Sequence, residues 1–301
     1  MVDDFGLLAA AGVLSGILAG FLGIGGGTIL VPIMVRLGFT PIEAVATSSL
    51  AIVVTSITGS VQNWRMGFLD LRKVLLLGFP ALVTAQLGVL LANVFPDYAL
   101  LGGFGLLLLL NVYLVGLRKQ VVAQKAKQES HQVDSQTIGT DPTDNGVGAG
   151  GTIQPPSTEF AGDGLEGSEQ RIKREMNPVL ARLITGSSAG ILAGLFGVGG
   201  GVIMVPLQIL LLGEGIKTAV QTSLGVIMIT AIAACSGHAL SGNVLFQAGL
   251  ILGLGGLLGV QVSTRFLPRL PDRAIMFMFR ALLALLSVYI FWQAWNSYLS
   301  R

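Results

Sequence analysis

Three consecutive glycines occur twice in this sequence, first as Gly25, Gly26 and Gly27 and then, 174 positions later, as Gly199, Gly200 and Gly201. Each triplet interrupts a long apolar segment, in which a glycine costs a helix about 1 kcal/mol relative to alanine. An unwound segment exposes backbone N–H groups, and a helix that begins there directs the positive end of its dipole to the same point. The two triplets therefore predict a site at which backbone N–H groups bind a small anion.

Side chains that could donate hydrogen bonds to the same anion follow each triplet at corresponding positions. They are a pair of hydroxyls in the next apolar segment and one glutamine in the segment after it. The candidate substrate-binding side chains are Thr47, Ser48 and Gln86 in the first half and Thr222, Ser223 and Gln261 in the second. The alternatives are that the hydroxyls cap helices and that the amides join helices inside the membrane.

The glycine spacing is also compatible with two other functions. Gly23 and Gly25 resemble part of a dinucleotide-binding loop with Glu43 as the acidic residue, but no strand precedes them and the second copy has Thr218 in place of the acid. The outer glycines are spaced for close helix packing, which explains them better than it explains the triplets. The packing pairs are Gly16 with Gly20 and Gly190 with Gly194.

The composition is that of an integral membrane protein. The chain has 301 residues, of which 52% are hydrophobic and 11% charged, and its mean hydropathy is +0.76. Soluble domains contain about 25% charged residues. One cysteine, Cys235, and two histidines give no disulfide framework and no metal-ligand spacing, so we expect no metal site, cofactor or catalytic residue. His238 is expected to be a polar turn residue at the end of its apolar segment.

The chain divides into two hydrophobic halves that match each other in order. Residues 1–119 form the first transmembrane repeat, 120–176 a polar linker expected to be disordered, and 177–301 the second repeat. Matching residues recur at a nearly constant offset, which indicates an internal duplication. The apolar segments are 7–37, 44–61, 74–95 and 98–117, followed by 180–212, 219–239, 245–264 and 274–298. The fold class predicted is an all-α polytopic membrane protein with two repeats of about four segments, in which glycines break the first helix of each.

The basic residues predict the orientation of the two halves. Lys and Arg accumulate on the cytoplasmic side of membrane spans. Both ends of the linker are basic, as are the turns that contain Arg65 and Arg269. These positions share one side only if each half crosses the membrane an odd number of times, which makes the repeats inverted, as in many secondary transporters.

The doubled Gly-x-Gly-Gly-Gly-x-x-x-Val-Pro motif, each copy followed by a Thr-Ser pair, resembles the sulfite exporter TauE/SafE family of membrane permeases. The resemblance covers both hydrophobic halves, and it implies transport of sulfur oxyanions or organosulfonates across the inner membrane. We expect a multi-pass secondary transporter whose partners are a small anion and the lipid bilayer, not nucleic acid, with a homodimer as one allowed assembly. The alternative is a membrane enzyme or assembly factor for a sulfur compound, but the spans lack a nucleophile–base pair or metal cluster. The sequence leaves open the anion, the direction of transport and the coupling ion.

Overall fold

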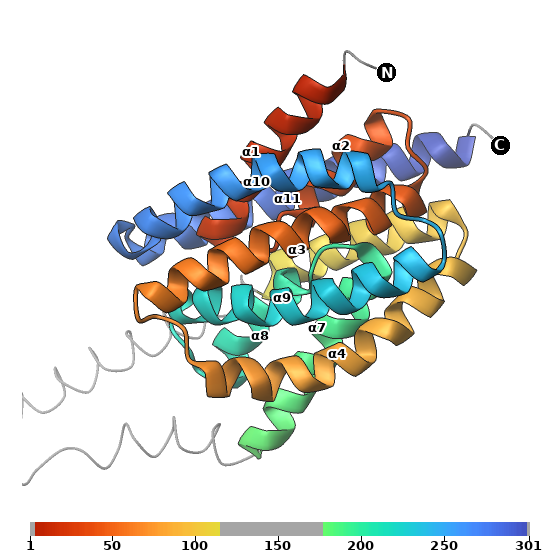
Figure 1. Cartoon of the computed structure of the whole chain (residues 1–301). Coiled ribbons are helices and arrows are strands. Elements are labelled where there is room, and N and C mark those ends of the chain that lie inside the picture. The colour runs from red at the N-terminus through yellow and green to blue at the C-terminus, as the bar shows by residue number, and fades with distance from the viewer. Residues whose placement is uncertain (1–3, 115–176, 300–301) are drawn as a thin grey trace, which may run out of the picture. The chain divides into compact units, whose positions relative to one another are not determined.

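The computed structural model of this chain describes residues 4–114 and 177–299, and within these ranges it contains helices and no strands (Figure 1). Eight of the described helices are long and apolar enough to cross a membrane. The predicted all-helical, polytopic membrane fold is therefore confirmed. The polar segment 120–176, predicted as a linker, lies outside the described residues. We refer to residues 4–114 as the first half and to residues 177–299 as the second half.

The helices follow the same order in both halves. The first half contains α1 (Asp4–Leu22), α2 (Gly27–Arg36), α3 (Pro41–Arg65), α4 (Leu71–Val94) and a helix at Asp97–Leu114. The second half contains α7 (Pro178–Phe196), α8 (Gly201–Leu211), α9 (Ile216–Leu240), α10 (Phe246–Phe266), the short helix η1 (Leu267–Arg269) and α11 (Asp272–Leu299). Each glycine-rich stretch separates a long helix from a short one, as the sequence predicts.

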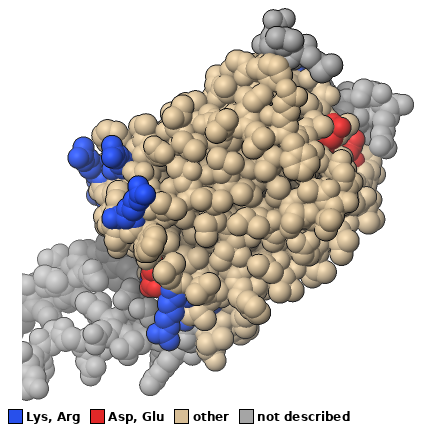
Figure 2. All heavy atoms as spheres, viewed as in Figure 1, with Lys and Arg blue, Asp and Glu red and all other residues tan. Residues whose placement is uncertain are grey.

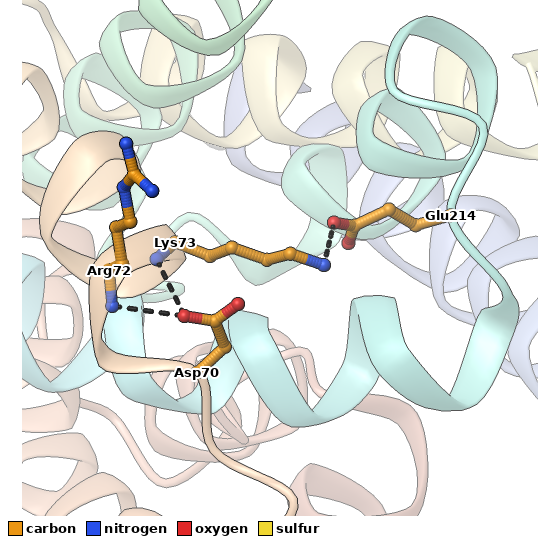
Figure 3. Close-up of polar contacts among 4 residues, drawn as sticks. All are labelled: Asp70, Arg72, Lys73 and Glu214. Atoms are coloured by element: carbon orange, nitrogen blue, oxygen red, sulfur yellow. Dashed lines mark hydrogen bonds and ion pairs between the residues drawn. The ribbon is translucent and has the colours of Figure 1, made fainter.

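Local side-chain caps define the starts of α3 and α4. The Thr40 hydroxyl accepts a hydrogen bond from the N–H of Glu43, whose carboxylate accepts one from the N–H of Thr40. This capping box stabilises the first turn of α3. At the start of α4, the carboxylate of Asp70 accepts hydrogen bonds from the N–H groups of Arg72 and Lys73 (Figure 3).

Close packing of small residues joins the two halves, because α1 packs against α10 and α7 packs against α4 (Figure 1). The closest approaches are Gly12 with Leu252, Gly16 with Gly256, Gly186 with Leu77 and Gly190 with Ala81. At each of these glycines a methyl group would lie 2.1–2.3 Å from the carbonyl oxygen of the partner residue. The packing predicted from the outer glycines is thus confirmed. Residue numbers rise together along both members of each pair, so the paired helices run parallel.

The matching helices α3 and α9 run in opposite directions. The Ser60 hydroxyl donates to the carbonyl oxygen of Leu224 over 3.1 Å, and Ile52 packs with Ile227 in a buried apolar cluster. Position 52 precedes position 60 along α3, whereas position 227 follows position 224 along α9. The two corresponding helices are therefore antiparallel in this central pair.

Ion pairs and hydrogen bonds bring three turns to one end of the helices. The ammonium group of Lys73 lies 2.9 Å from a carboxylate oxygen of Glu214, and that of Lys217 lies 3.1 Å from the carbonyl oxygen of Pro268. The turns at 66–70, 212–215 and η1 thus share an end, which we call the basic end. Figure 2 shows Lys and Arg gathered toward the left of the view, where α3 and α10 end. The basic residues in or beside these turns are Arg65, Arg72, Lys73, Lys217, Arg265, Arg269 and Arg273.

The glycine-broken helices enter and leave at the same end. Because α1 runs parallel to α10, it points toward the basic end, whereas α2 leads back to the start of α3 at the opposite end. In the same way α7 points away from the basic end, and α8 returns to it at the turn before α9. Each short helix therefore begins in the interior and runs outward.

Candidate anion-binding site

The structure brings the two glycine-rich stretches into direct contact. A methyl group on Gly27 would lie 2.1 Å from the carbonyl oxygen of Gly197, and one on Gly201 would lie 2.1 Å from that of Gly23. Residues far apart in the sequence therefore form one continuous structure at the interface of the halves. This close approach leaves no space for any side chain larger than hydrogen at Gly27 and Gly201.

The contact lies halfway along the central helices. A methyl group on Gly199 would contact both Ile227, 2.8 Å away, and Ile52, 3.3 Å away. Each isoleucine is the twelfth residue of a 25-residue helix, Ile52 in α3 and Ile227 in α9. The two glycine turns, residues 23–27 and 197–201, thus lie near the middle of α3 and α9, which are the most buried of the candidate membrane spans.

A left-handed backbone conformation starts each short helix. Gly26 precedes α2 with a φ of 77°, and Gly200 precedes α8 with a φ of 76°. A residue with a Cβ adopts this conformation only at a cost, so both positions favour glycine. The conformation turns the chain sharply, which allows α2 and α8 to begin next to the opposing half.

Hydroxyl groups bind the carbonyl oxygens of the glycine turns. The four donors are buried serines and threonines, and two of them cross between the halves. The bonds are Ser223 to Gly23 (2.9 Å), Ser48 to Gly197 (3.0 Å), Ser15 to Gly26 (3.1 Å) and Thr230 to Gly199 (3.0 Å). These contacts fix the turns and direct hydroxyl protons at the oxygens that would otherwise repel an anion.

The N–H groups of the same turns are left without acceptors. In the part of the chain that the structure describes, no hydrogen bond is donated by the N–H groups of residues 25–28 or 199–202. Neither α2 nor α8 has a side-chain cap, in contrast to α3 and α4, and neither has an acidic residue in its first turn. Two positive helix ends therefore meet in the interior, and their first N–H groups donate to no acceptor among the described residues.

Thr28 adds a side chain that the sequence analysis missed. It is the second residue of α2 and fully buried, and its hydroxyl has no hydrogen-bond partner among the described residues. Side chains on a helix lean toward its N-terminus, so this hydroxyl lies beside the glycine turn. The second half has Val202 at the corresponding position. This difference between two otherwise matching motifs is the sequence signal that could have identified Thr28.

The structure separates the other predicted site residues from one another. Thr47 and Thr222 are buried, and the Thr47 hydroxyl accepts a hydrogen bond from the N–H of Leu245, the residue that precedes α10. Gln86 and Gln261 are exposed on their helices. The Gln86 amide donates to the carbonyl oxygen of Ala233 over 2.7 Å and so joins α4 to α9. Neither glutamine is brought to the buried glycine turns.

Two further sequence interpretations are settled by local contacts. Glu43, the candidate ribose-binding acid of a dinucleotide site, belongs to the capping box of α3. The prediction that His238 is a polar turn residue is wrong, because it lies within α9, fully buried, with Nε2 2.9 Å from the carbonyl oxygen of Gly194. Since a carbonyl oxygen only accepts hydrogen bonds, this contact places the proton on Nε2.

Comparison with known proteins gives the same family over nearly the whole chain. The sulfite exporter TauE/SafE family matches residues 8–290. "Probable membrane transporter protein YunE" of Bacillus subtilis (strain 168) is 23% identical over 298 residues, which cover 96% of this chain and 98% of that protein. A second relative from the same strain, "Probable membrane transporter protein YdhB", is 23% identical over 92% of this chain and 97% of its own length.

A more similar but shorter match comes from Haemophilus influenzae (strain ATCC 51907 / DSM 11121 / KW20 / Rd), where a "Probable membrane transporter protein" is 40% identical over 104 residues. This match covers 32% of the present chain and 39% of that protein. No solved structure matches the chain. The family and these relatives are named as membrane transporters, in agreement with the prediction that the chain is not an enzyme. The protein described here belongs to the sulfite exporter TauE/SafE family and is a multi-pass membrane transporter.

Proposed function

We propose that the chain is a secondary transporter of small anions, of the sulfur oxyanion or organosulfonate class, and that the two glycine turns form its substrate site. The observation that carries this proposal is the meeting of two uncapped helix N-termini whose N–H groups donate no hydrogen bond within the described residues. The donors to the anion are the backbone N–H groups of Gly25, Gly26, Gly27, Gly199, Gly200 and Gly201, together with the hydroxyl of Thr28.

The hydrogen bonds at the turns give the predicted serines a specific role in this proposal. Ser48 and Ser223 hold the glycine carbonyl oxygens of the opposing half, so they position the N–H groups rather than bind the anion. Hydrogen bonds to a charged group contribute about 1.5–3 kcal/mol each. Several such bonds inside a buried site offset the cost of removing a small oxyanion from water.

The opposite directions of the two halves support alternating access. Transporters built from inverted repeats bind substrate near mid-membrane, at broken helices, and open to either side by moving one repeat against the other. Here α3 and α9 run antiparallel, and α2 and α8 lead from the shared site to opposite ends of the helices. In this proposal the site opens along α2 toward one end and along α8 toward the other.

The charge distribution supports a cytoplasmic location for the basic end, with the chain in the cell membrane. Positive residues remain on the cytoplasmic side during insertion. Because α1 with α2, and α7 with α8, each return to the end from which they start, the remaining three long helices give each half an odd number of crossings. The duplication and its inversion in the membrane are part of this proposal.

Uptake by purified protein in liposomes tests the proposal. We expect concentrative or exchange uptake of sulfite, thiosulfate or an organosulfonate, driven by a proton gradient or by the gradient of the anion. Protein-free liposomes and liposomes that contain a Thr28→Val variant are the controls. Absence of uptake for every sulfur anion, with protein shown to be folded and correctly inserted, would contradict the proposed substrate class.

A further inference from the structure

The two short helices differ at one buried position. Gln208 is the eighth residue of α8 and is fully buried, and neither its amide nitrogen nor its amide oxygen has a hydrogen-bond partner among the described residues. The eighth residue of α2 is Met34, which is also fully buried. A methionine fills such a position without a polar group, whereas an unpaired buried amide is costly and calls for an explanation.

Two charged side chains, Glu214 and Lys73, lie at the basic end near the end of α8. The backbone carbonyl of Gln208 accepts a hydrogen bond from the N–H of Glu214 over 3.2 Å, so the two residues are adjacent at the end of α8. One carboxylate oxygen of Glu214 pairs with Lys73, and the other is buried without a partner in the described part of the chain. Figure 3 shows Lys73 and Glu214 extending toward each other from the start of α4 and from the turn before α9.

The corresponding positions at the opposite end are apolar. The sequence offset places Phe39 where the second half has Glu214, and Ala248 where the first half has Lys73. Together with Met34, these residues give α2 no counterpart of the Gln208 amide or of the Lys73–Glu214 ion pair, whereas Arg36 lies exposed in the last turn of α2. The residues along α2 and along α8, between the glycine turns and the two ends, therefore differ in chemistry.

The length of α8 separates Gln208 from the glycine turns. Gln208 is seven positions beyond Gly201 along the helix, a rise of about 10 Å. The backbone of Gln208 thus lies farther along α8, toward the basic end, than the N–H groups at the start of the helix. A ligand of Gln208 would occupy a separate position, closer to the basic end.

Resting on the proposed transport of a small anion, we propose that Gln208 forms a second binding position for the same anion between the glycine turns and the basic end. Its amide N–H group donates to the anion, and the Lys73–Glu214 ion pair closes the outer side of this position. Lys73 attracts the anion when the pair opens, and Glu214 neutralises Lys73 when the position is empty. The feature has no equivalent along α2, so it acts on entry or release at the basic end only.

Replacing Gln208 by the residue that the first half uses gives a direct test. Gln208→Met removes the amide while preserving a long side chain, and Gln247→Met, at an exposed glutamine of α10, is the matched control. We expect Gln208→Met to be at least as stable as the native protein to heat, but with anion affinity and uptake rate reduced by about tenfold, as for loss of one charge-assisted hydrogen bond. Gln247→Met should behave as the native protein.

Calorimetric titration with sulfite, thiosulfate and an organosulfonate, combined with uptake in liposomes, separates the outcomes. Native affinity and uptake in Gln208→Met would overturn the inference, and would mean that the amide holds only a structural water. If Gln208→Met does not fold, Gln208→Asn replaces it, because the shorter side chain withdraws the amide from the proposed position. Reduced affinity in Gln208→Asn would support the second binding position, and native affinity would overturn it. If the native protein binds none of the anions, the proposed function itself fails, whereas loss of binding in Thr28→Val with no effect of Gln208→Met removes only the second position.

Discussion

The hydroxyl of Ser48 lies 3.0 Å from the carbonyl oxygen of Gly197, a residue 149 positions later in the chain. The same relationship exists in reverse, because the Ser223 hydroxyl lies 2.9 Å from the carbonyl oxygen of Gly23. Each half thus fixes the glycine turn of the other half. The candidate site is built jointly by two halves, and neither could form its own turn in this way alone.

Removal of these hydroxyls should weaken the contact between the halves. We expect Ser48→Ala and Ser223→Ala each to lower the free energy of unfolding by about 1–2 kcal/mol, since each leaves a buried carbonyl without its hydroxyl donor. The decrease in the free energy of unfolding of the double variant should equal the sum of the two single decreases, because the two bonds are made at different turns. Thermal unfolding in detergent measures the effect. An unchanged midpoint in both single variants would show that the hydroxyls do not hold the turns.

Alanine at the helix-starting glycines should destabilise the protein strongly. Gly200 has a φ of 76°, and a methyl group there would lie 2.3 Å from the carbonyl oxygen of Ala189. Left-handed strain and overpacking together are expected to cost about 2–5 kcal/mol in Gly200→Ala.

Gly38→Ala is the matched control for this strain. Gly38 has a φ of 93°, but no atom lies within 4 Å of the added methyl group. Its cost should be limited to about 1–2 kcal/mol. Equal yields of folded protein and equal unfolding midpoints for Gly38→Ala and Gly200→Ala would contradict the close packing at Gly200.

The exposed glutamines should be dispensable for anion binding. We expect Gln261→Leu to retain native stability and affinity, because the side chain is exposed on α10. Gln86→Leu should lose about 1 kcal/mol of stability through the missing bond to Ala233, again with unchanged affinity. Binding titrations on both variants test this. A tenfold loss of affinity in Gln261→Leu would show that this glutamine does contribute to anion binding.

Much of the fold is predictable from the sequence because membrane spans and helix breaks have local causes. Apolar runs of spanning length predict the long helices, and the triplets at Gly25 and Gly199 predict where the short helices begin. The packing glycines of α1 and α7 are also visible as small residues at helical spacing. What the sequence does not reveal is the partner helix, because nothing local to Gly16 indicates that it contacts Gly256 of the other half.

The candidate site is less predictable, because apolar membrane helices carry little information about which face is buried. In a soluble helix the polar face marks the solvent side, but a membrane helix is apolar toward lipid and toward protein alike. Gln86 and Gln261 were therefore expected inside and are exposed, whereas His238 was expected in a turn and is buried. Differences between corresponding residues, such as Thr28 and Val202, are a better signal of polar function.

The orientation proposed for the helices can be measured by cysteine accessibility. In a Cys235→Ser background, single cysteines at Phe68 and Pro268 should react from the cytoplasmic side, because both lie in turns of the basic end. A cysteine at Ser241, beyond the end of α9, should react only from the other side. Labelling of Phe68→Cys and Pro268→Cys from opposite sides would contradict the inverted arrangement.

Titration of Thr28→Val with sulfite, thiosulfate and an organosulfonate tests most directly whether the two uncapped helix starts and the Thr28 hydroxyl bind the transported anion. Valine has nearly the same shape and is the residue that the second half has at this position, so the variant should fold normally. We predict an affinity loss of about tenfold in Thr28→Val, equivalent to about 1.4 kcal/mol, and near-native affinity in Thr28→Ser, which retains the hydroxyl. Native affinity in a folded Thr28→Val would contradict the claim.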